Sequence, residues 1–344
     1  MRVQVARPSV IAHRGVPTWR LEHSAESYRY AFARGADYIE PDVVCSRDGV
    51  LVVRHEVEIG ETTDVADHPR FADRHRTALV DGKKRTGWFA EDFTWAELQT
   101  LRLRERIPDL RPQNRLLDGT ARMLRLEEAL ELVAAENRRR GRHRPPVGVY
   151  IETKHPTYHR EIGLDLEPRL LDALTEAGIA RADQGTPVVL QSMETTLGWF
   201  AERTDLPLLQ LVSRRGGPYD RLAAGERLRY ADMITDQGLA RIAEYAGGIG
   251  PHKDLVIART DDGALAAETG LVERAHAAGL FVHAWTMRDE NSFLPADLRS
   301  GDDPADHGDA QAEVARFLAA GVDGVFADDC LTASAARDLW VGGA

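Results

Sequence analysis

Short apolar runs that alternate with helical patterns are the feature that most limits the fold of this chain. Eight runs are each long enough for one buried strand, at 9–13, 37–44, 147–153, 187–192, 207–212, 247–250, 280–285 and 323–328. Helices are predicted between them at 24–35, 124–140, 163–178, 193–204, 271–279 and 309–321. This alternation predicts an α/β protein, and eight such units favour a closed TIM (β/α)8 barrel.

An open doubly wound sheet is the alternative arrangement. Such a sheet usually carries a glycine-rich nucleotide-binding loop directly after its first strand. The residues at the end of the first predicted strand, "HRGVPT" (13–18), do not have that pattern. The closed barrel is therefore the preferred prediction.

The second and third predicted strands are too far apart for one βα unit. Roughly a hundred residues separate them, whereas a few tens are enough. We predict an insertion at 56–123, near the active-site mouth of a single catalytic barrel domain that spans 1–344. Thr94 and Glu97 have the spacing of a capping box and predict a short helix in it. A packed surface elaboration and a wall of the mouth are equally compatible with this insertion.

The second predicted strand carries two carboxylates at alternate positions. Side chains two residues apart share one face of a strand, so Glu40 and Asp42 face the same way, opposite to the apolar residues. The dipeptide Asp48-Gly49 then signals a hairpin. If these two residues alone form the turn, His55 lies directly opposite Asp42, at about 5 Å.

In a barrel, the C-terminal ends of the strands surround the active site. Polar and aromatic residues stand at or near these ends: His13, Arg14, Glu40, Asp42, Glu152, Lys154, Gln191, Trp285 and Asp328. Each has an ordinary explanation alone, such as a hydrogen-bonded core histidine or a packing aromatic. Their convergence has none, because burial of three carboxylates without a cation is costly.

The carboxylates Glu40, Asp42 and Glu152 would offer oxygen ligands from separate strands. Oxygen ligands suit one hard divalent cation, Mg²⁺ or Ca²⁺ or alternatively Mn²⁺, rather than zinc. We therefore expect a divalent cation as cofactor.

The remaining residues of the mouth suit phosphate chemistry. His13 and His55 have the residue type that donates and accepts protons near neutral pH. Arg14 and Lys154 supply positive charge, and the planar fork of an arginine fits a phosphate. The sequence therefore predicts cation-assisted phosphoester chemistry on a small molecule.

The charge of the chain argues against some partners. It has 44 basic and 55 acidic residues, a net charge of −11, which disfavours nonspecific binding to nucleic acid or to an anionic membrane. No apolar run approaches the length of a membrane span, so no stable membrane insertion is expected. Residues 1–13 lack the apolar core of an export signal, which predicts a cytoplasmic protein. An exported form whose signal has been removed is the alternative.

Several motifs together resemble the glycerophosphodiester phosphodiesterase family across nearly the whole chain. They are "HRG" (13–15), "EHS" (22–24), "GADYIEPDV" (35–43), "RDGVLVVRHE" (47–56), "YIETKHP" (150–156), "LQS" (190–192), "HAWT" (283–286) and "GVDGVFADD" (321–329). The first motif alone is weak, but this order and spacing are highly specific. The long insertion resembles a bacterial subgroup that includes periplasmic glycerophosphodiesterases.

The resemblance implies a TIM barrel that uses a divalent metal to hydrolyse glycerophosphodiesters, which are deacylated phospholipids such as glycerophosphocholine. The products would be glycerol 3-phosphate and an alcohol, formed through a cyclic phosphate intermediate. The residue roles that it implies are an acid/base pair, metal ligands, and contacts to phosphate and to substrate: His13 and His55; Glu40, Asp42 and Glu152; Arg14 and Lys154; Gln191 and Trp285.

Three departures from the family pattern lie outside these residues. Leu21 replaces a proline, Cys45 a threonine, and "FADDC" (326–330) a sequence with a proline-bearing turn. They leave the preferred alcohol open. Cleavage of intact lipids, as in barrel-type phospholipase D toxins, is a related alternative, and an inactive barrel that binds phosphodiesters is a third. The sequence carries no signal for the oligomeric state.

Overall fold

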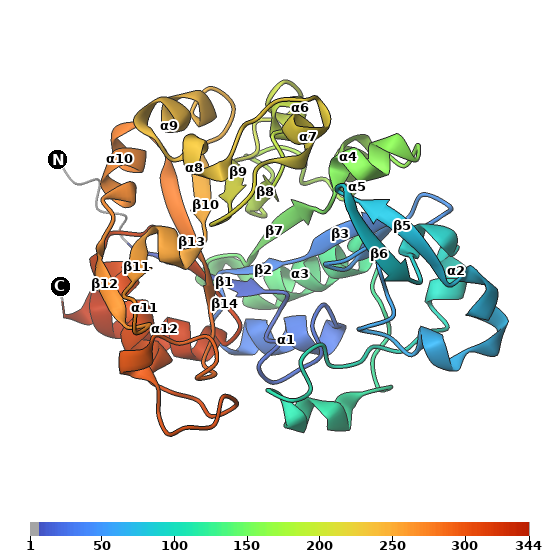
Figure 1. Cartoon of the computed structure of the whole chain (residues 1–344), viewed down its shortest axis with the longest axis horizontal. Helices are drawn as coiled ribbons and strands as arrows, with labels where there is room; N and C mark the ends of the chain where they lie inside the picture. Colours follow the sequence, from blue (N-terminus) through green and yellow to red (C-terminus); the bar gives the residue numbers. More distant parts are fainter. Residues whose placement is uncertain (1–6, 344) are drawn as a thin grey trace.

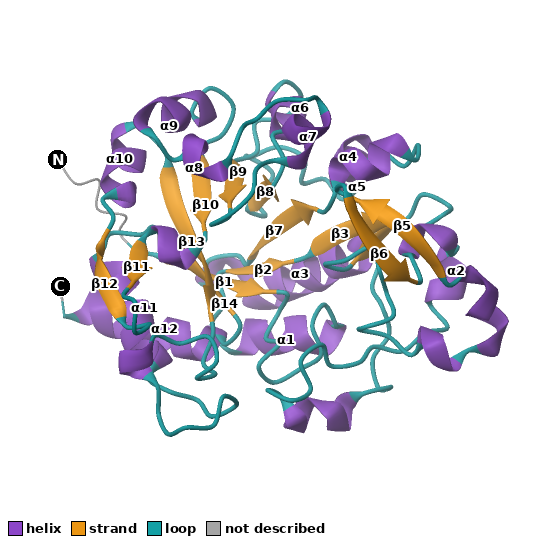
Figure 2. Cartoon of the chain, in the orientation of Figure 1, coloured by secondary structure: helices purple, strands orange, loops and turns teal. Residues whose placement is uncertain are grey.

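A computed structural model describes residues 7–343 of the chain. Its centre is a closed barrel of eight parallel strands, in the order β2, β1, β14, β13, β10, β9, β8 and β7. Pairing between β2 and β7 closes the ring. The helices lie around the ring of strands (Figures 1 and 2). The predicted TIM barrel is confirmed, and closure excludes the open doubly wound sheet.

The barrel strands agree with the predicted runs to within a few residues at their ends, except that the predicted strand 37–44 is divided at Pro41 into two strands. Their bounds are β1 Ser9–His13, β2 Tyr38–Glu40, β7 Gly148–Thr153, β8 Val188–Ser192, β9 Leu208–Val212, β10 Gly248–Pro251, β13 Phe281–Met287 and β14 Gly324–Ala327. The strands outside the ring are β3 Asp42–Cys45, β4 Leu51–Val53, β5 Arg76–Val80, β6 Lys83–Gly87, β11 Ile257–Arg259 and β12 Leu265–Glu268.

Each predicted helix also exists, and several helices were not anticipated. The predicted ones are α1 Ala25–Ala33, α3 Leu126–Arg140, α5 Leu166–Glu176, α6 Leu197–Ala201, α10 Leu271–Ala277 and α11 Ala310–Ala319, with the capped α2 Trp95–Leu98. The unanticipated ones are α4 Pro156–Glu161, α7 Tyr219–Ala223, α8 Tyr230–Met233, α9 Asp236–Ile242 and α12 Cys330–Gly342. Most of these are short and lack a clear apolar periodicity.

Two apolar layers hold the barrel together. The interior of the ring is filled by Ile11, Tyr150, Val189, Leu209, Leu211 and Phe326. A larger cluster packs the outer face of the strands against the helices, and it includes Ile39 and Val43. The apolar residues of the second predicted strand therefore face the helices, which leaves the opposite face to Glu40 and Asp42.

The hairpin after β3 differs from the prediction by one residue. Val43 pairs with Val53 and Cys45 with Leu51, so the loop has three residues, 47–49, rather than two. Gly49 at the end of this loop has a φ of +83°, the left-handed conformation that a three-residue hairpin loop uses. Asp42 is therefore opposite Arg54, whose amide N–H donates to the Asp42 carbonyl at 2.9 Å. His55 is not directly opposite Asp42, and it lies beyond the end of the ladder.

The chain between β4 and α3 forms a second packed unit beside the barrel. Its own apolar cluster includes Phe71, Phe89, Phe93 and Leu101. Strands β5 and β6 form an antiparallel hairpin, and Figure 1 shows it beside β3 and α4. Among residues 7–343, no helix combines the length and the apolar character that a bilayer crossing requires.

Candidate active site

Strand register brings three carboxylates together at one end of the barrel. Glu40 ends β2, where it is beside His13 at the end of β1. Asp42 begins β3 and pairs with Glu152 in β7, which is in turn beside Gln191 in β8. One ligand oxygen of each of Glu40, Asp42 and Glu152 lies within 4.8 Å of the others, and all three residues are buried. The convergence predicted for these carboxylates is present.

Hydrogen bonds from the surrounding residues fix the orientation of this acidic cluster. The Gln191 side-chain amide donates to Glu40 at 2.9 Å, and the ammonium group of Lys154 donates to Glu152 at 2.8 Å. The His23 Nε2 lies 3.0 Å from Asp42 Oδ2. One oxygen, Oδ1 of Asp42, is buried and has no hydrogen-bond partner.

The crowding of negative charge is visible in the pKa values of the cluster. Burial and the neighbouring carboxylates raise the pKa of Glu40 well above its usual value. Burial likewise raises the pKa of Glu152 to about 7, although Lys154 opposes the shift. Burial also disfavours the charge on Asp42, but Lys154 and two histidines hold its pKa well below the usual value. The cluster is short of positive charge.

This donor set fits one divalent cation. The three residues offer oxygen ligands that hard cations prefer, from neighbouring strands whose positions the ladder fixes. The unpartnered Asp42 Oδ1 and the raised pKa values of Glu40 and Glu152 are the features that a bound cation would relieve. The cluster can therefore hold an ion.

The turn after β1 places Arg14 against the cluster. Arg14 has a φ of +57°, and its amide N–H donates to Glu40 at 2.9 Å. Its side-chain Nε lies 3.6 Å from Asp42 Oδ2 and has no hydrogen-bond partner. A Cβ on Gly15 would approach Ser27 Oγ to 2.3 Å, so only glycine fits the next position. The sequence "HRG" therefore places one cationic donor at the mouth.

His13 is held by a carboxylate from the last strand region of the chain. Its Nδ1 lies 2.6 Å from Oδ1 of Asp328, which follows β14. Arg288 and Arg111 oppose the effect of burial and keep the pKa of Asp328 well below its usual value, so this carboxylate is ionised. Because a carboxylate only accepts hydrogen bonds, His13 carries its proton on Nδ1. Burial and Arg14 lower the pKa of His13 to about 4.

His55 has a carboxylate partner of its own. Its Nδ1 is hydrogen-bonded to Glu56, the next residue in the chain. Burial and the nearby Arg14 and Lys154 lower the pKa of His55 to about 3. The charge of His55 is one of the influences on the pKa of Asp42, so the histidine is near the cluster despite the shifted hairpin register.

Trp285 is directed to a neighbouring strand. Its indole N–H donates to the Gly250 carbonyl in β10 at 2.6 Å, and its ring packs edge-on against His252 at 5.0 Å between centroids. These contacts place Trp285 on the rim between β10 and β13. They do not include the acidic cluster.

Sequence reasoning did not identify several residues that contact the predicted ones. They are His23 on Asp42, Glu56 on His55, Arg111 and Arg288 on Asp328, and Arg106 on both Glu22 and Glu56. His23 and Glu56 lie in the quoted motifs, and Arg288 follows the seventh barrel strand, so strand-end reasoning extends to them. Arg106 and Arg111 come from the 56–123 segment and have no local signal.

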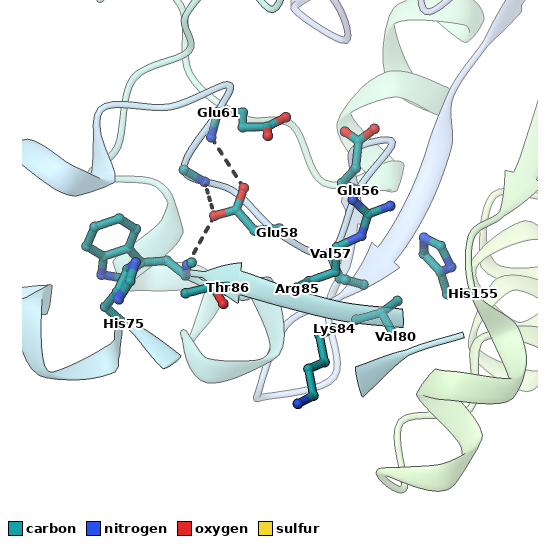
Figure 3. A pocket seen from close by; sticks show the side chains of 13 residues that line it. Glu56, Val57, Glu58, Glu61, His75, Val80, Lys84, Arg85, Thr86 and His155 are labelled. Atoms are coloured by element: carbon teal, nitrogen blue, oxygen red, sulfur yellow. Dashed lines mark hydrogen bonds between the residues drawn. The ribbon is translucent and has the colours of Figure 1, made fainter. Parts of the chain in front are cut away.

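A cavity of about 480 Å³ lies between the loop after β4 and strand β6. Figure 3 shows polar side chains around it, including Glu56, Arg85 and His155, and the ring of Trp88 also lines it. Glu56 is the partner of His55, and His155 follows Lys154. Two residues that line the cavity, Glu56 and His155, are therefore sequence neighbours of the candidate site residues His55 and Lys154.

Comparison with known proteins agrees with this arrangement. Residues 13–332 match the model of the glycerophosphoryl diester phosphodiesterase family. A glycerophosphodiester phosphodiesterase of Arabidopsis thaliana is 34% identical over 338 residues, which cover 95% of this chain and 85% of that protein. One from Haemophilus influenzae is 28% identical over 304 residues, with 81% of this chain and 78% of that protein covered.

A solved structure shares the fold at low sequence identity. A phosphodiesterase of Oleispira antarctica, in complex with the product sn-glycerol-3-phosphate, superposes with a TM-score of 0.62. The identity is 19%, and the match covers 96% of this chain and 97% of that one. The family match spans the residues of the acidic cluster and both candidate histidines. This chain therefore belongs to the glycerophosphoryl diester phosphodiesterase family, whose members are phosphoric diester hydrolases.

Proposed function

We propose that the protein hydrolyses glycerophosphodiesters, such as glycerophosphocholine, to glycerol 3-phosphate and an alcohol, with one divalent cation as cofactor. The observation that carries this proposal is the buried carboxylate cluster in a member of this family. The product named for the Oleispira antarctica structure, sn-glycerol-3-phosphate, supports the choice of substrate class.

Glu40, Asp42 and Glu152 would hold the cation, which is Mg²⁺, Ca²⁺ or Mn²⁺. When bound, it would neutralise negative charge at the phosphoryl group and lower the pKa of the attacking hydroxyl. Arg14 has an unpartnered Nε, and it would contact a phosphoryl oxygen together with Lys154. Both groups would stabilise the charge that develops there during the reaction.

His13 and His55 would act as the acid/base pair. In the first step, the 2-hydroxyl of the glycerol unit attacks phosphorus, one histidine accepts the hydroxyl proton, and the other protonates the departing alcohol. A cyclic phosphodiester forms, and water opens it with the histidine roles reversed. An adjacent hydroxyl is favoured over external water because an intramolecular attack has a smaller entropic cost.

We infer a role for the 56–123 segment from the cavity that its residues line. We infer that the leaving alcohol enters the space next to Glu56 and Trp88. Trp88→Ala should then change KM among choline, ethanolamine and glycerol esters by different factors while kcat for each changes little. Equal changes for all head groups would remove the cavity from substrate selection. The prediction about an export signal concerns residues 1–13, of which 1–6 lie outside the residues that the structure describes.

The defining experiment is an assay of glycerophosphocholine after chelation, followed by addition of Mg²⁺, Ca²⁺ or Mn²⁺ separately. Activity should vanish with chelator and return with at least one cation. Full activity in excess chelator would contradict cation dependence.

The cyclic route has its own comparison, a phosphodiester of propane-1,3-diol, which lacks the 2-hydroxyl. Cleavage at a rate similar to the glycerol compound would exclude that route.

A further inference from the structure

Both candidate acid/base histidines are held through a carboxylate by an arginine from the same short loop. The loop comprises residues 104–111 and lies in the segment between β4 and α3. His55 contacts Glu56, and Arg106 contacts Glu56. His13 contacts Asp328, and Arg111 contacts Asp328. Each of the two histidines is therefore bonded to a carboxylate that an arginine of this one loop holds.

On the His55 side, Arg106 bridges two carboxylates. Its Nη2 lies 2.5 Å from Glu56 and 2.5 Å from Glu22, and its Nε donates to Glu22 at 2.7 Å. Glu22 also pairs with Arg14 at 3.3 Å. A carboxylate that is fixed in this way presents one orientation to the histidine ring and keeps the ring proton on Nδ1. The Nε2 of His55 is then the nitrogen available for proton transfer.

On the His13 side, the ion pairs are almost completely buried. The Arg111 side chain is 4% exposed, and Asp328 and Glu290 are 2% and 0% exposed. Arg111 donates to Asp328 at 2.6 Å through Nη2 and to Glu290 at 2.5 Å through Nε. The second oxygen of Asp328 thus accepts from Arg111 and also from Arg288 Nε at 3.0 Å, while the first oxygen faces His13.

The loop is itself anchored to the barrel. The Asn114 amide donates to the Pro17 carbonyl, in the turn after β1, at 2.8 Å and to Glu105 at 2.9 Å. The Glu105 amide N–H donates to Asp118 at 2.8 Å. The Arg111 amide N–H donates to the Ile107 carbonyl at 2.9 Å. These bonds hold the backbone of the loop in place, so Arg106 and Arg111 extend from fixed positions toward their partners.

Fold closure alone does not account for these contacts. The buried Arg111 and the partly buried Arg106, whose side chain is 20% exposed, cost desolvation, and apolar residues of similar volume often close such a seam equally well. We propose that Arg106 and Arg111 are positioning residues, which fix the tautomer and ring orientation of His55 and His13 through Glu56 and Asp328. This inference rests on the acid/base roles proposed above for the two histidines.

The direct test observes the histidine rings rather than the reaction. Nitrogen-15 spectra of the rings in the metal-free full chain would be assigned with His13→Ala and His55→Ala. Arg106→Met should shift the ring signals of His55 and leave those of His13 unchanged, and Arg111→Met should do the reverse. Unchanged signals, or equal shifts of both rings in each variant, would overturn the proposal.

The kinetic test uses glycerophosphocholine with the cation that restores activity. Each arginine-to-methionine change should lower kcat about 10- to 100-fold with KM changed less than about threefold, because displaced catalytic groups lose rate steeply. Arg106→Lys and Arg111→Lys should recover part of kcat. They also provide a second test where a methionine variant does not fold. Arg104→Met is the matched control, because Arg104 is in the same loop but pairs with Asp67 at the exposed surface.

A double-mutant cycle separates positioning from general damage. Arg106→Met combined with Glu56→Gln should cost much less than the product of the two single effects, whereas Arg106→Met with Asp328→Asn should multiply. Multiplicative effects in both pairs would overturn the proposal. If His13→Ala and His55→Ala keep the wild-type rate, the acid/base roles on which this proposal rests fail instead, and if the wild type hydrolyses no glycerophosphodiester, the proposed function fails. If both histidine variants are inactive while the arginine variants have wild-type kcat, only the positioning proposal fails.

Discussion

At the scale of single residues, the buried carboxylate cluster lowers the stability of the fold but would supply the cation site that the proposed function needs. Glu40, Asp42 and Glu152 are buried within 4.8 Å of one another, and their mutual repulsion is part of the cause of the raised pKa values of Glu40 and Glu152. A raised pKa of a carboxyl means that its charged form is destabilised by folding. The same crowding would favour a divalent cation among these oxygens.

Replacing one of these carboxylates by an amide should therefore raise the stability of the metal-free chain and weaken cation binding. Glu40→Gln and Glu152→Gln should stabilise the metal-free chain by about 1 kcal/mol, because one repulsion is removed. Both should weaken cation binding in calorimetry and lower turnover, as should Asp42→Asn. A variant of Glu40 or Glu152 that loses stability while it binds the cation normally would contradict this assignment.

The two histidines should behave differently from the carboxylates. Removal of a general acid or base costs about a hundredfold to ten-thousandfold in rate. His13→Ala and His55→Ala should lose kcat to this extent, whereas calorimetric cation affinity should stay within a few-fold of wild type. A rate close to wild type in either variant would remove that residue from the acid/base pair.

At the scale of elements, the dipeptide Asp-Gly shows how far a local signal reaches. At Asp81-Gly82 both residues have positive φ, and Val80 pairs with Lys83, which makes the two-residue hairpin that the dipeptide favours. At Asp48-Gly49 only the glycine does, and the loop has three residues. The first hairpin was overlooked, because β6 is largely exposed and polar. The second was predicted with the wrong register, because the neighbouring ladder determines which turn forms.

Local patterns predicted the barrel strands because each is a continuous apolar run flanked by turn residues. They predicted the residues at the strand ends, because barrel geometry gathers those ends. They did not predict Arg106 or Arg111, whose partners Glu22 and Asp328 lie 84 and 217 positions away. An ion pair between such distant positions depends on how a loop crosses the fold, and the sequence around an arginine does not encode that.

Gly15, in the turn after β1, and Gly178, which follows α5, form a matched pair of glycines for a test. Gly15 and Gly178 have φ values of +93° and +69°, but only at Gly15 would a Cβ collide with another residue. Gly178→Ala should cost about 1 kcal/mol from backbone strain alone and leave activity unchanged. Gly15→Ala should cost more and should also lower kcat, because it displaces Arg14. Denaturant unfolding and the hydrolysis assay measure both, and equal costs would show that the collision is relieved elsewhere.

At the scale of the whole molecule, the chain should lose stability as the pH rises past neutrality. Glu194 follows β8, is 3% exposed, and accepts a hydrogen bond at 3.2 Å from the amide of Thr157 in α4. Burial raises its pKa to about 8, although Thr157 opposes the shift. The unfolded chain releases this proton near the ordinary value of 4.5, whereas the folded chain holds it to about pH 8. The resulting stabilisation is complete below pH 4.5 and is lost as the pH rises through 8.

Glu194→Gln should remove this dependence. Between pH 5 and pH 9 the unfolding free energy of the wild type should fall by about 4 kcal/mol more than that of the variant. Denaturant unfolding at several pH values measures the difference. Asp205→Asn is a control, because it also replaces a carboxylate by an amide, at a side chain that is 49% exposed. Parallel pH curves for wild type and Glu194→Gln would show that Glu194 titrates normally.

The hydrogen bond between His13 and Asp328 joins residues 315 positions apart. Its consequence concerns the order of events during protein synthesis. The first strand leaves the ribosome long before its partner β14 exists, so a growing chain can bury apolar surface but cannot assemble the His13 site. In the acid/base role proposed for His13, catalysis requires the final strand to be translated and docked. A chain truncated before Asp328 should therefore be inactive, and turnover would report that the final strand is in place.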